Sequence, residues 1–386
     1  MAQNQIHDDL MYLAGRLLHR GAQTDAERSA AEFIRQRLSQ STPDVHLDEF
    51  SSFDNYTFLF ASYYSEFLVV SLLAVWWPLV AAAYGLFVFL CYLAEFLGYR
   101  VFARMLPQFE SQNVVARFLG LRPRMTLLVT AHYDSGNANL LSQPWILPWL
   151  RPLHALLVFC MVVVIASSAV EGWSLVMQRQ FEAAAHLRWT AAGLLATASL
   201  ILFYVSSQGE DIRGAIGNAS GVAALLQLAE RLRTHPLEEA DVWLVATGSH
   251  EAWMSGMRHL LVANKLEKKH CQILNLEGVG AGGLRYITAE GMLIATPAGS
   301  TLRRAAEAVA GEYGAAPALL RAVPTAAHVP LARGYRSMTI MGLDDEGLPP
   351  HWNQPSDRVT EVDEDSIARA AAFSDAILRR VVNAAP

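Results

Sequence analysis

The sequence predicts an α/β fold into which four transmembrane helices are inserted as two hairpins. Two long apolar blocks interrupt a more polar chain, and within the polar part short apolar runs alternate with helical patterns. Of the 386 residues, 53% are hydrophobic and only 17% are charged. Such a composition is unusually apolar for a soluble chain and indicates a membrane protein.

Charge and cysteine content limit the partners and the chemistry. The net charge is −6 and the lysines and arginines form no long run, which argues against nucleic-acid binding. Three scattered cysteines, at positions 91, 160 and 271, support neither a disulfide framework nor a thiolate zinc cluster. We therefore expect the lipid bilayer as a partner and no nucleic acid, and leave a membrane-protein or peptide partner open.

The first apolar block, residues 57–98, predicts a transmembrane hairpin. It is too long for one span, which needs roughly 20 residues. Trp76 and Trp77, followed by Pro78, mark the bend and supply interfacial aromatic side chains.

The second apolar block, residues 152–205, predicts another hairpin. Its middle, residues 171–188, carries several charged side chains and is expected to form a short exposed loop between two spans. A pair of buried helices in a soluble protein is the weaker alternative, because the apolar runs are long.

Two hairpins return the chain each time to the side from which it left. Residues 1–56, 99–151 and 206–386 then share one compartment and can form a single domain. The arginines that flank the spans on that side are Arg100, Arg104, Arg151 and Arg213. The positive-inside rule therefore predicts a cytoplasmic domain.

The polar part of the chain has the pattern of an α/β domain. Apolar runs at 126–131, 242–247 and 273–276 are typical of buried strands. Residues 220–233 and 362–382 have helical spacing, and so do residues 6–40.

Polar residues follow the strand-like runs, where ligands collect in α/β sheets. His132 and Asp134 follow the first run, His250 and Glu251 the second, and Glu277 the third. Two further polar segments are Gly217-Asn218-Ala219-Ser220-Gly221, which opens a helix, and His351-Trp352-Asn353-Gln354-Pro355. A lone His-x-Asp is more often a capped turn than a ligand pair, but the order and spacing of all these segments are informative.

Together these segments resemble the co-catalytic zinc aminopeptidase family, which includes bacterial leucyl aminopeptidase, plasma glutamate carboxypeptidase and, as a relative, glutaminyl cyclase. The resemblance covers the whole polar part and implies a zinc-aminopeptidase-like, mixed and mostly parallel sheet flanked by helices. In such enzymes two zinc ions share a bridging carboxylate and a bridging water, and a glutamate is the general base.

The resemblance implies roles for four residues that match the family pattern. His132, Glu251 and Glu277 stand at metal-ligand positions, although Glu277 replaces the usual aspartate. Asp134 stands where an aspartate orients the ligand imidazole.

Three family positions are replaced. Gly217 stands where the bridging aspartate is expected, His250 where the general base is expected, and Asn353 where the last ligand histidine is expected. His328 and His351 are candidate substitute ligands. Without a bridging carboxylate, two dications about 3.5 Å apart would repel each other strongly, which argues against a di-zinc centre.

Three functions stay open at this point. Because the bridge, the base and the terminal histidine change together, we favour a pseudo-peptidase that binds a peptide, a lipid headgroup or a protein partner. The first alternative is a metal-dependent peptidase or amidohydrolase with a rebuilt single-zinc site. In it His132 and Glu277 hold the ion with help from His250, His328 or His351, and His250 could be the base with Asp134 assisting. The second alternative is an acyl (amide) transferase. The expected cofactor is one zinc ion for an enzyme and none for a pseudo-enzyme.

Overall fold

The computed structural model describes residues 2–178 and 182–384, which divide into two compact units. The sheet unit comprises Met1–Asp54, Gln108–Gln143 and Glu210–Pro386. The helical unit comprises Asn55–Pro107 and Pro144–Gly209.

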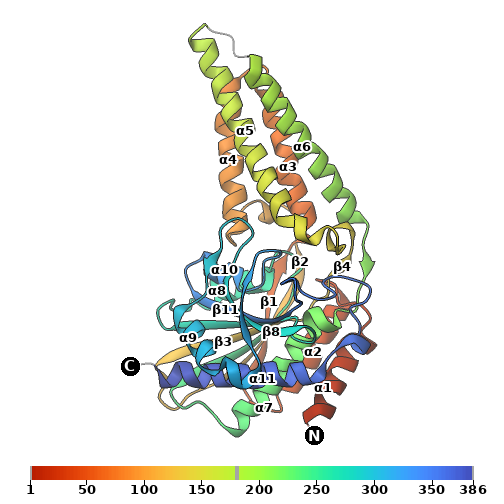
Figure 1. Ribbon diagram of the computed structural model, residues 1–386, viewed down its shortest axis with the longest axis vertical. Coiled ribbons are helices and arrows are strands. Elements are labelled where there is room, and N and C mark those ends of the chain that lie inside the picture. Colours follow the sequence, from red (N-terminus) through yellow and green to blue (C-terminus); the bar gives the residue numbers. More distant parts are fainter. Residues whose placement is uncertain (1, 179–181, 385–386) are drawn as a thin grey trace. The chain divides into compact units, whose positions relative to one another are not determined.

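The sheet unit contains a nine-stranded mixed sheet with the order β1-β2-β6-β3-β7-β11-β8-β10, and β9 pairs with β8 (Figure 1). Its four central strands, β6, β3, β7 and β11, run parallel. Strands β1 and β2 are antiparallel to their neighbours, whereas β8 is antiparallel to β11 and β9 and parallel to β10. The strands are β1 (Val45–Ser52), β2 (Phe109–Phe118), β3 (Met125–His132), β6 (Ala240–Thr247), β7 (Cys271–Glu277), β8 (Gly283–Glu290), β9 (Thr296–Pro297), β10 (Ala316–Leu320) and β11 (Arg336–Leu343). The predicted fold class is confirmed.

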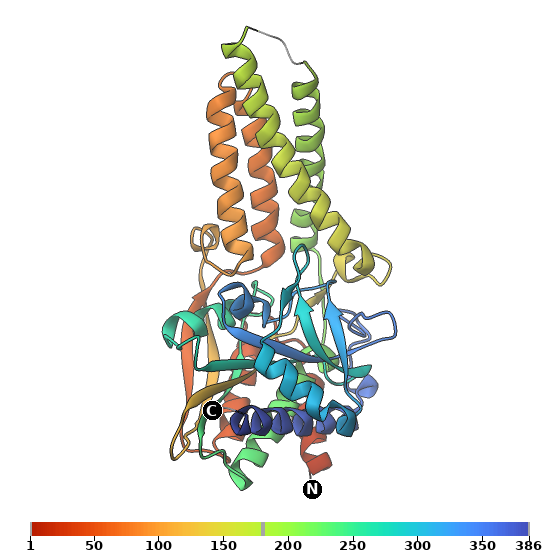
Figure 2. The same cartoon turned by 60° about the vertical axis from the view of Figure 1, so that its left-hand side comes forward.

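Helices cover both faces of the sheet (Figure 2). One face carries α1 (Ala2–Leu10), α2 (Asp25–Leu38), α7 (Ser220–Thr234), α9 (Ser300–Val309) and α11 (Glu364–Asn383). The shorter helices α8 (Ser255–Ala263) and α10 (His328–Ala332) pack together on the opposite face.

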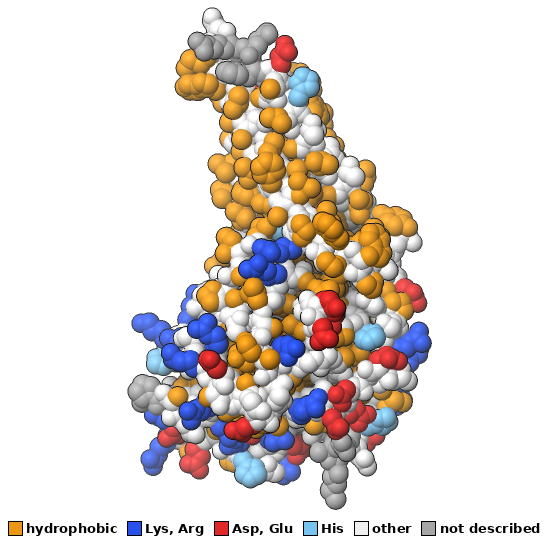
Figure 3. All heavy atoms as spheres, in the orientation of Figure 1, with side chains coloured by type: hydrophobic (Ala, Val, Ile, Leu, Met, Phe, Trp, Pro, Cys, Tyr) orange, Lys and Arg blue, Asp and Glu red, His pale blue; other side chains and the backbone are white. Residues whose placement is uncertain are grey.

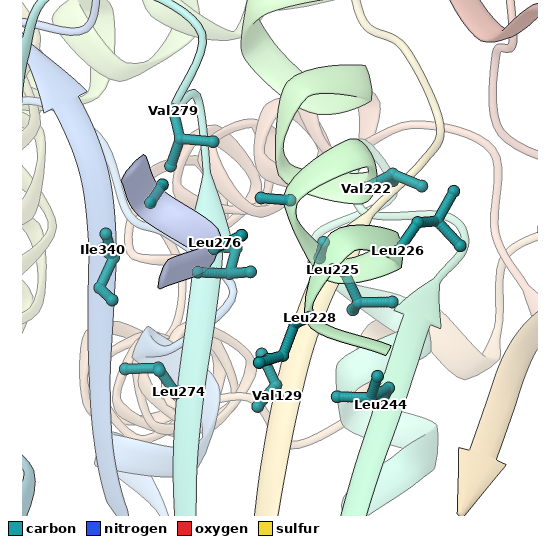
Figure 4. Packing of buried hydrophobic residues seen from close by; sticks show 14 of the residues in the cluster. Val129, Val222, Leu225, Leu226, Leu228, Leu244, Leu274, Leu276, Val279 and Ile340 are labelled. Carbon is teal, nitrogen blue, oxygen red and sulfur yellow. The ribbon is translucent and has the colours of Figure 1, made fainter. Parts of the chain in front are cut away.

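The core lies between α7 and the central parallel strands (Figure 4). Leu225 and Leu228 of α7 point toward Val129 of β3, and all three are fully buried. Because β3 and β7 are buried on both faces, their sequences are nearly continuous apolar runs. This packing fixes the strand ends that carry the polar residues.

The helical unit consists of four helices that are long and apolar enough to cross a membrane. They are α3 (Tyr56–Leu73), α4 (Pro78–Phe96), α5 (Leu150–Val176) and α6 (Glu182–Ser207). Figure 3 shows that hydrophobic side chains dominate the visible surface of this unit, whereas charged side chains gather on the sheet unit. The membrane hairpins and the domain division drawn from them stay a prediction.

One expectation for the second hairpin is wrong. Residues 171–188 do not form one exposed loop, because α5 extends to Val176 and α6 begins at Glu182. Arg188 is 2% exposed and donates two hydrogen bonds, of 2.9 and 3.2 Å, to the Glu171 carboxylate. The two charges neutralise each other, so the helices can continue through positions that looked too polar for them.

Candidate metal centre

Three predicted site residues meet at the carboxyl ends of adjacent parallel strands. His132 ends β3, Glu277 ends β7, and His250 lies in the turn that follows β6. One donor atom from each side chain lies within 4.8 Å of the other two. We call these three residues the triad. The structure thus brings His250, expected at the position of the general base, into a group of potential ligands.

His132 is buried and surrounded by carboxylates. Its Nδ1 lies 3.2 Å from the main-chain oxygen of Asp134 and 3.6 Å from Oδ1 of the same residue. Burial alone would lower the pKa of His132, but the hydrogen bond to Asp134 and the charges of Glu277, Asp134 and Glu251 raise it. The negative charge around this imidazole favours a cation in the site.

His250 stacks on His132 with ring centroids 4.0 Å apart. Burial, followed by repulsion from His132, lowers the pKa of His250 to about 4. His250 is therefore neutral at pH 7, which is the form that binds metals. Its Nδ1 is buried and has no hydrogen-bond partner among the described residues.

Glu277 is held by Asn275 of its own strand and by the turn that precedes α10. Its Oε2 accepts hydrogen bonds of 3.0 Å from Asn275 Nδ2 and 3.3 Å from the Ala326 backbone N–H. Asn275 is in turn fixed by the Thr130 hydroxyl, which donates to its Oδ1 at 3.0 Å. Such outer contacts keep a metal ligand in one orientation.

Residues 198–377 match peptidase family M28. The resemblance to the co-catalytic zinc aminopeptidases is thereby confirmed. None of the curated protein sequences compared with the chain matches it.

Solved structures with the same fold include zinc enzymes. The zinc aminopeptidase of Bacillus subtilis is 13% identical, with 97% of this chain and 94% of that chain covered and a TM-score of 0.58. A Zn-dependent exopeptidase of Parabacteroides distasonis is 13% identical, with 99% and 98% covered and a TM-score of 0.53. The glutaminyl cyclase of Porphyromonas gingivalis is also 13% identical, with 97% of both chains covered and a TM-score of 0.51. At these identities the likeness shows the fold alone.

Gly217, where the M28 resemblance implies a bridging aspartate, faces Asp357. The Asp357 carboxylate accepts hydrogen bonds from the backbone N–H groups of Ile216, at 2.5 Å, and Gly217, at 3.1 Å. A Cβ atom on residue 217 would lie 3.1 Å from Asp357 Oδ2. Asp357 therefore occupies the space next to the missing side chain.

Glu251 and Asn353, at two further M28 ligand positions, interact with each other. The Asn353 side chain hydrogen-bonds the Glu251 carboxylate, and the Glu251 backbone N–H donates to Asp134 Oδ2 at 2.9 Å. Burial, followed by the charge of Asp134, raises the pKa of Glu251 to about 7. Glu251 is not a member of the triad.

The two candidate substitute ligands do not belong to the triad either. His351 Nδ1 lies 2.8 Å from the Ser356 hydroxyl, and the residue is left-handed with φ of 57°. His328 is buried at the start of α10.

No sequence pattern indicated Arg20, a fully buried residue that hydrogen-bonds the segments beside the site. Its guanidinium donates to the main-chain oxygens of Tyr133, at 2.9 Å, and Gly214, at 3.2 Å, and also to Asn218 Oδ1. Burial lowers the pKa of Arg20 to about 10, so it stays cationic at pH 7. In the sequence Arg20 is an isolated arginine between two helical segments, so no local pattern connects it with the site.

The triad fits a zinc ion in its chemistry. Two imidazoles and one carboxylate are among the ligand sets that zinc takes in single-metal enzymes, with a fourth position left for water or substrate. A cation would satisfy the buried His250 nitrogen and balance the carboxylates that surround His132. The described residues thus fit one ion at the triad.

Proposed function

We propose that the chain is a membrane-anchored, M28-like metalloprotein that holds one zinc ion at the triad and hydrolyses an amide bond of a peptide or related substrate. The observation that carries this proposal is the approach of His132, His250 and Glu277 donor atoms to within 4.8 Å. Two histidines and one glutamate are the zinc ligands of single-metal peptidases.

The chain's own residues divide the remaining work. When bound, zinc polarises a carbonyl and lowers the pKa of water. Asp134 and Asn275 orient the ligand side chains His132 and Glu277. Glu251, a carboxyl close enough to interact electrostatically with His132 and Glu277, is the group that exchanges a proton with water or the leaving amine.

A pseudo-peptidase is the second candidate, supported by a different observation. Asn353 hydrogen-bonds Glu251, and Asp357 lies where a side chain on Gly217 would reach. Side chains at the positions where the M28 resemblance implies ligands of a second metal are therefore engaged in contacts within the chain. In this case the site binds a peptide, a lipid headgroup or a protein partner without chemistry.

Purified full-length protein in detergent, assayed against a peptide library and acyl-amide substrates, distinguishes the two candidates. We expect hydrolysis that falls at least about 100-fold in Glu251→Gln and in His132→Ala, because proton transfer and metal binding are each lost. His351→Ala, whose histidine lies outside the triad, is the matched control and should keep wild-type activity. Absence of hydrolysis in a zinc-loaded wild-type protein would favour the pseudo-peptidase.

A further inference from the structure

His250 lies in a strained turn. The segment between β6 and α8, here called the His250 turn (residues 248–254), contains three left-handed residues that are not glycine: Ser249 with φ of 48°, Trp253 with 53° and Met254 with 56°. Side chains disfavour this region, so such conformations persist only where surrounding contacts hold them. Contacts with residues outside the His250 turn must therefore hold its conformation.

Glu27, near the start of α2, provides one such contact. Its carboxylate is 1% exposed and accepts the Ser249 backbone N–H at 2.8 Å. The Ser111 hydroxyl, at 3.1 Å, the Gln23 backbone N–H, at 2.7 Å, and the Ser249 hydroxyl, at 3.4 Å, also donate to it. Thr24 caps the helix through its own side chain, so Glu27 is not needed as the cap.

Asp134 holds the His250 turn on the other side of His250. It accepts the Glu251 backbone N–H at 2.9 Å, so the residues before and after His250 are each bonded to a buried carboxylate. Burial, followed by the charge of Asp134, raises the pKa of Glu27 to about 8, so this carboxyl is largely protonated at pH 7. In that form it still has an oxygen that accepts the Ser249 backbone N–H.

We propose that Glu27 is a positioning residue: by binding the Ser249 N–H it holds the left-handed His250 turn that presents His250 to His132 and Glu277. This inference rests on the proposed function only where zinc affinity is concerned. The arrangement of the turn itself does not depend on a metal.

The test compares Glu27→Ala, Ser249→Gly and the double variant with wild type. Glycine adopts positive φ without strain, so Ser249→Gly should reduce the need for Glu27. Glu32→Ala, a change at a half-buried position on the same helix, is the control. Two readouts are needed: amide hydrogen exchange of residues 248–256 in metal-free protein, and the zinc Kd from competition with a chelator.

We expect faster exchange in Glu27→Ala and a zinc affinity about 10- to 100-fold weaker, the usual effect of losing an outer contact of a metal site. The double variant should recover much of both, and Glu32→Ala should change neither. If Glu27→Ala does not fold, Glu27→Gln, which keeps one acceptor oxygen, should show a smaller change in the same direction.

Unchanged exchange in Glu27→Ala, or no recovery in the double variant, would overturn the inference. A wild-type protein that binds no zinc would overturn the proposed function instead. Faster exchange in metal-free Glu27→Ala would still support the role of Glu27 in that case.

Discussion

At the scale of residues, Gly217 and Asp357 lie together at the position where the M28 resemblance implies a bridging aspartate. Asp357 caps two backbone N–H groups of the turn that in M28-like enzymes is expected to carry the bridging carboxylate. Restoring the carboxylate by substitution therefore competes with contacts that the chain already makes.

Gly217→Asp is expected not to rebuild a second metal site. The new Cβ would meet Asp357 Oδ2 at 3.1 Å, and the two carboxylates would repel each other. We expect a loss of about 1–3 kcal/mol in the free energy of unfolding, measured by denaturant titration, and no added zinc. Gly311→Ala, at a site where an added methyl group would have no heavy atom within 4 Å, should be close to neutral. A second zinc in Gly217→Asp would contradict this interpretation.

Zinc affinity should depend on the protonation of His132. Its pKa is raised above the ordinary 6.5, and the protonated imidazole cannot bind a metal. The zinc affinity is therefore highest above this pKa and falls as the pH decreases through it. Asp134→Asn removes a main cause of the increase, so the fall should move to lower pH.

The measurement is the zinc Kd between pH 5 and 8. Asp48→Asn, which alters a comparable carboxylate at the His259 pair, is the control and should leave the profile unchanged. A profile that does not shift in Asp134→Asn would show that Asp134 does not set the protonation of His132.

At the scale of elements, the strands that are buried on both faces of the sheet were the ones best predicted from the sequence. The runs that became β3, β6 and β7 are nearly continuous apolar sequences, so they were recognisable. Strands β8 and β10 are partly exposed and lack this signal.

The candidate site was predictable only in part, for a physical reason. His132 and Glu277 are the last residues of strands and Asp134 follows one closely, so all three could be found by position. Asp357 and Glu27 act through contacts with residues 140 and 222 positions away in the chain, which no local pattern encodes. We infer that the approach of His250 to His132 and Glu277 depends on the left-handed backbone of Ser249, a conformation that a serine in the sequence does not indicate.

The Arg188–Glu171 pair between α6 and α5 gives a prediction at this scale. Glu171→Ala leaves a buried arginine without its charge partner, so we expect the helical unit to lose about 3–5 kcal/mol. Removing both charges, in Glu171→Ala with Arg188→Leu, should cost clearly less. Thermal unfolding in detergent tests this, and equal losses in the two variants would show that the pair is not coupled.

At the scale of the whole molecule, the sheet unit and the helical unit are separate compact parts of one chain that passes between them four times. Four helices with sufficient length and hydropathy support the proposal of two hairpins, and the arginines beside them support a cytoplasmic sheet unit.

Cysteine labelling of intact cells tests that orientation. In a background without the three native cysteines, Trp76→Cys, at the exposed turn between α3 and α4, should react with a membrane-impermeant maleimide. Glu312→Cys, exposed on the sheet unit, should react only after lysis. The reverse pattern would place the sheet unit outside the cytoplasm.

The central claim is a single zinc ion at the triad, and elemental analysis of purified protein tests it most directly. We expect one zinc per chain in wild type, and a loss of zinc in His132→Ala, His250→Ala and Glu277→Ala. Wild-type protein with no zinc after incubation with the metal, or with two zinc ions per chain, would contradict the claim.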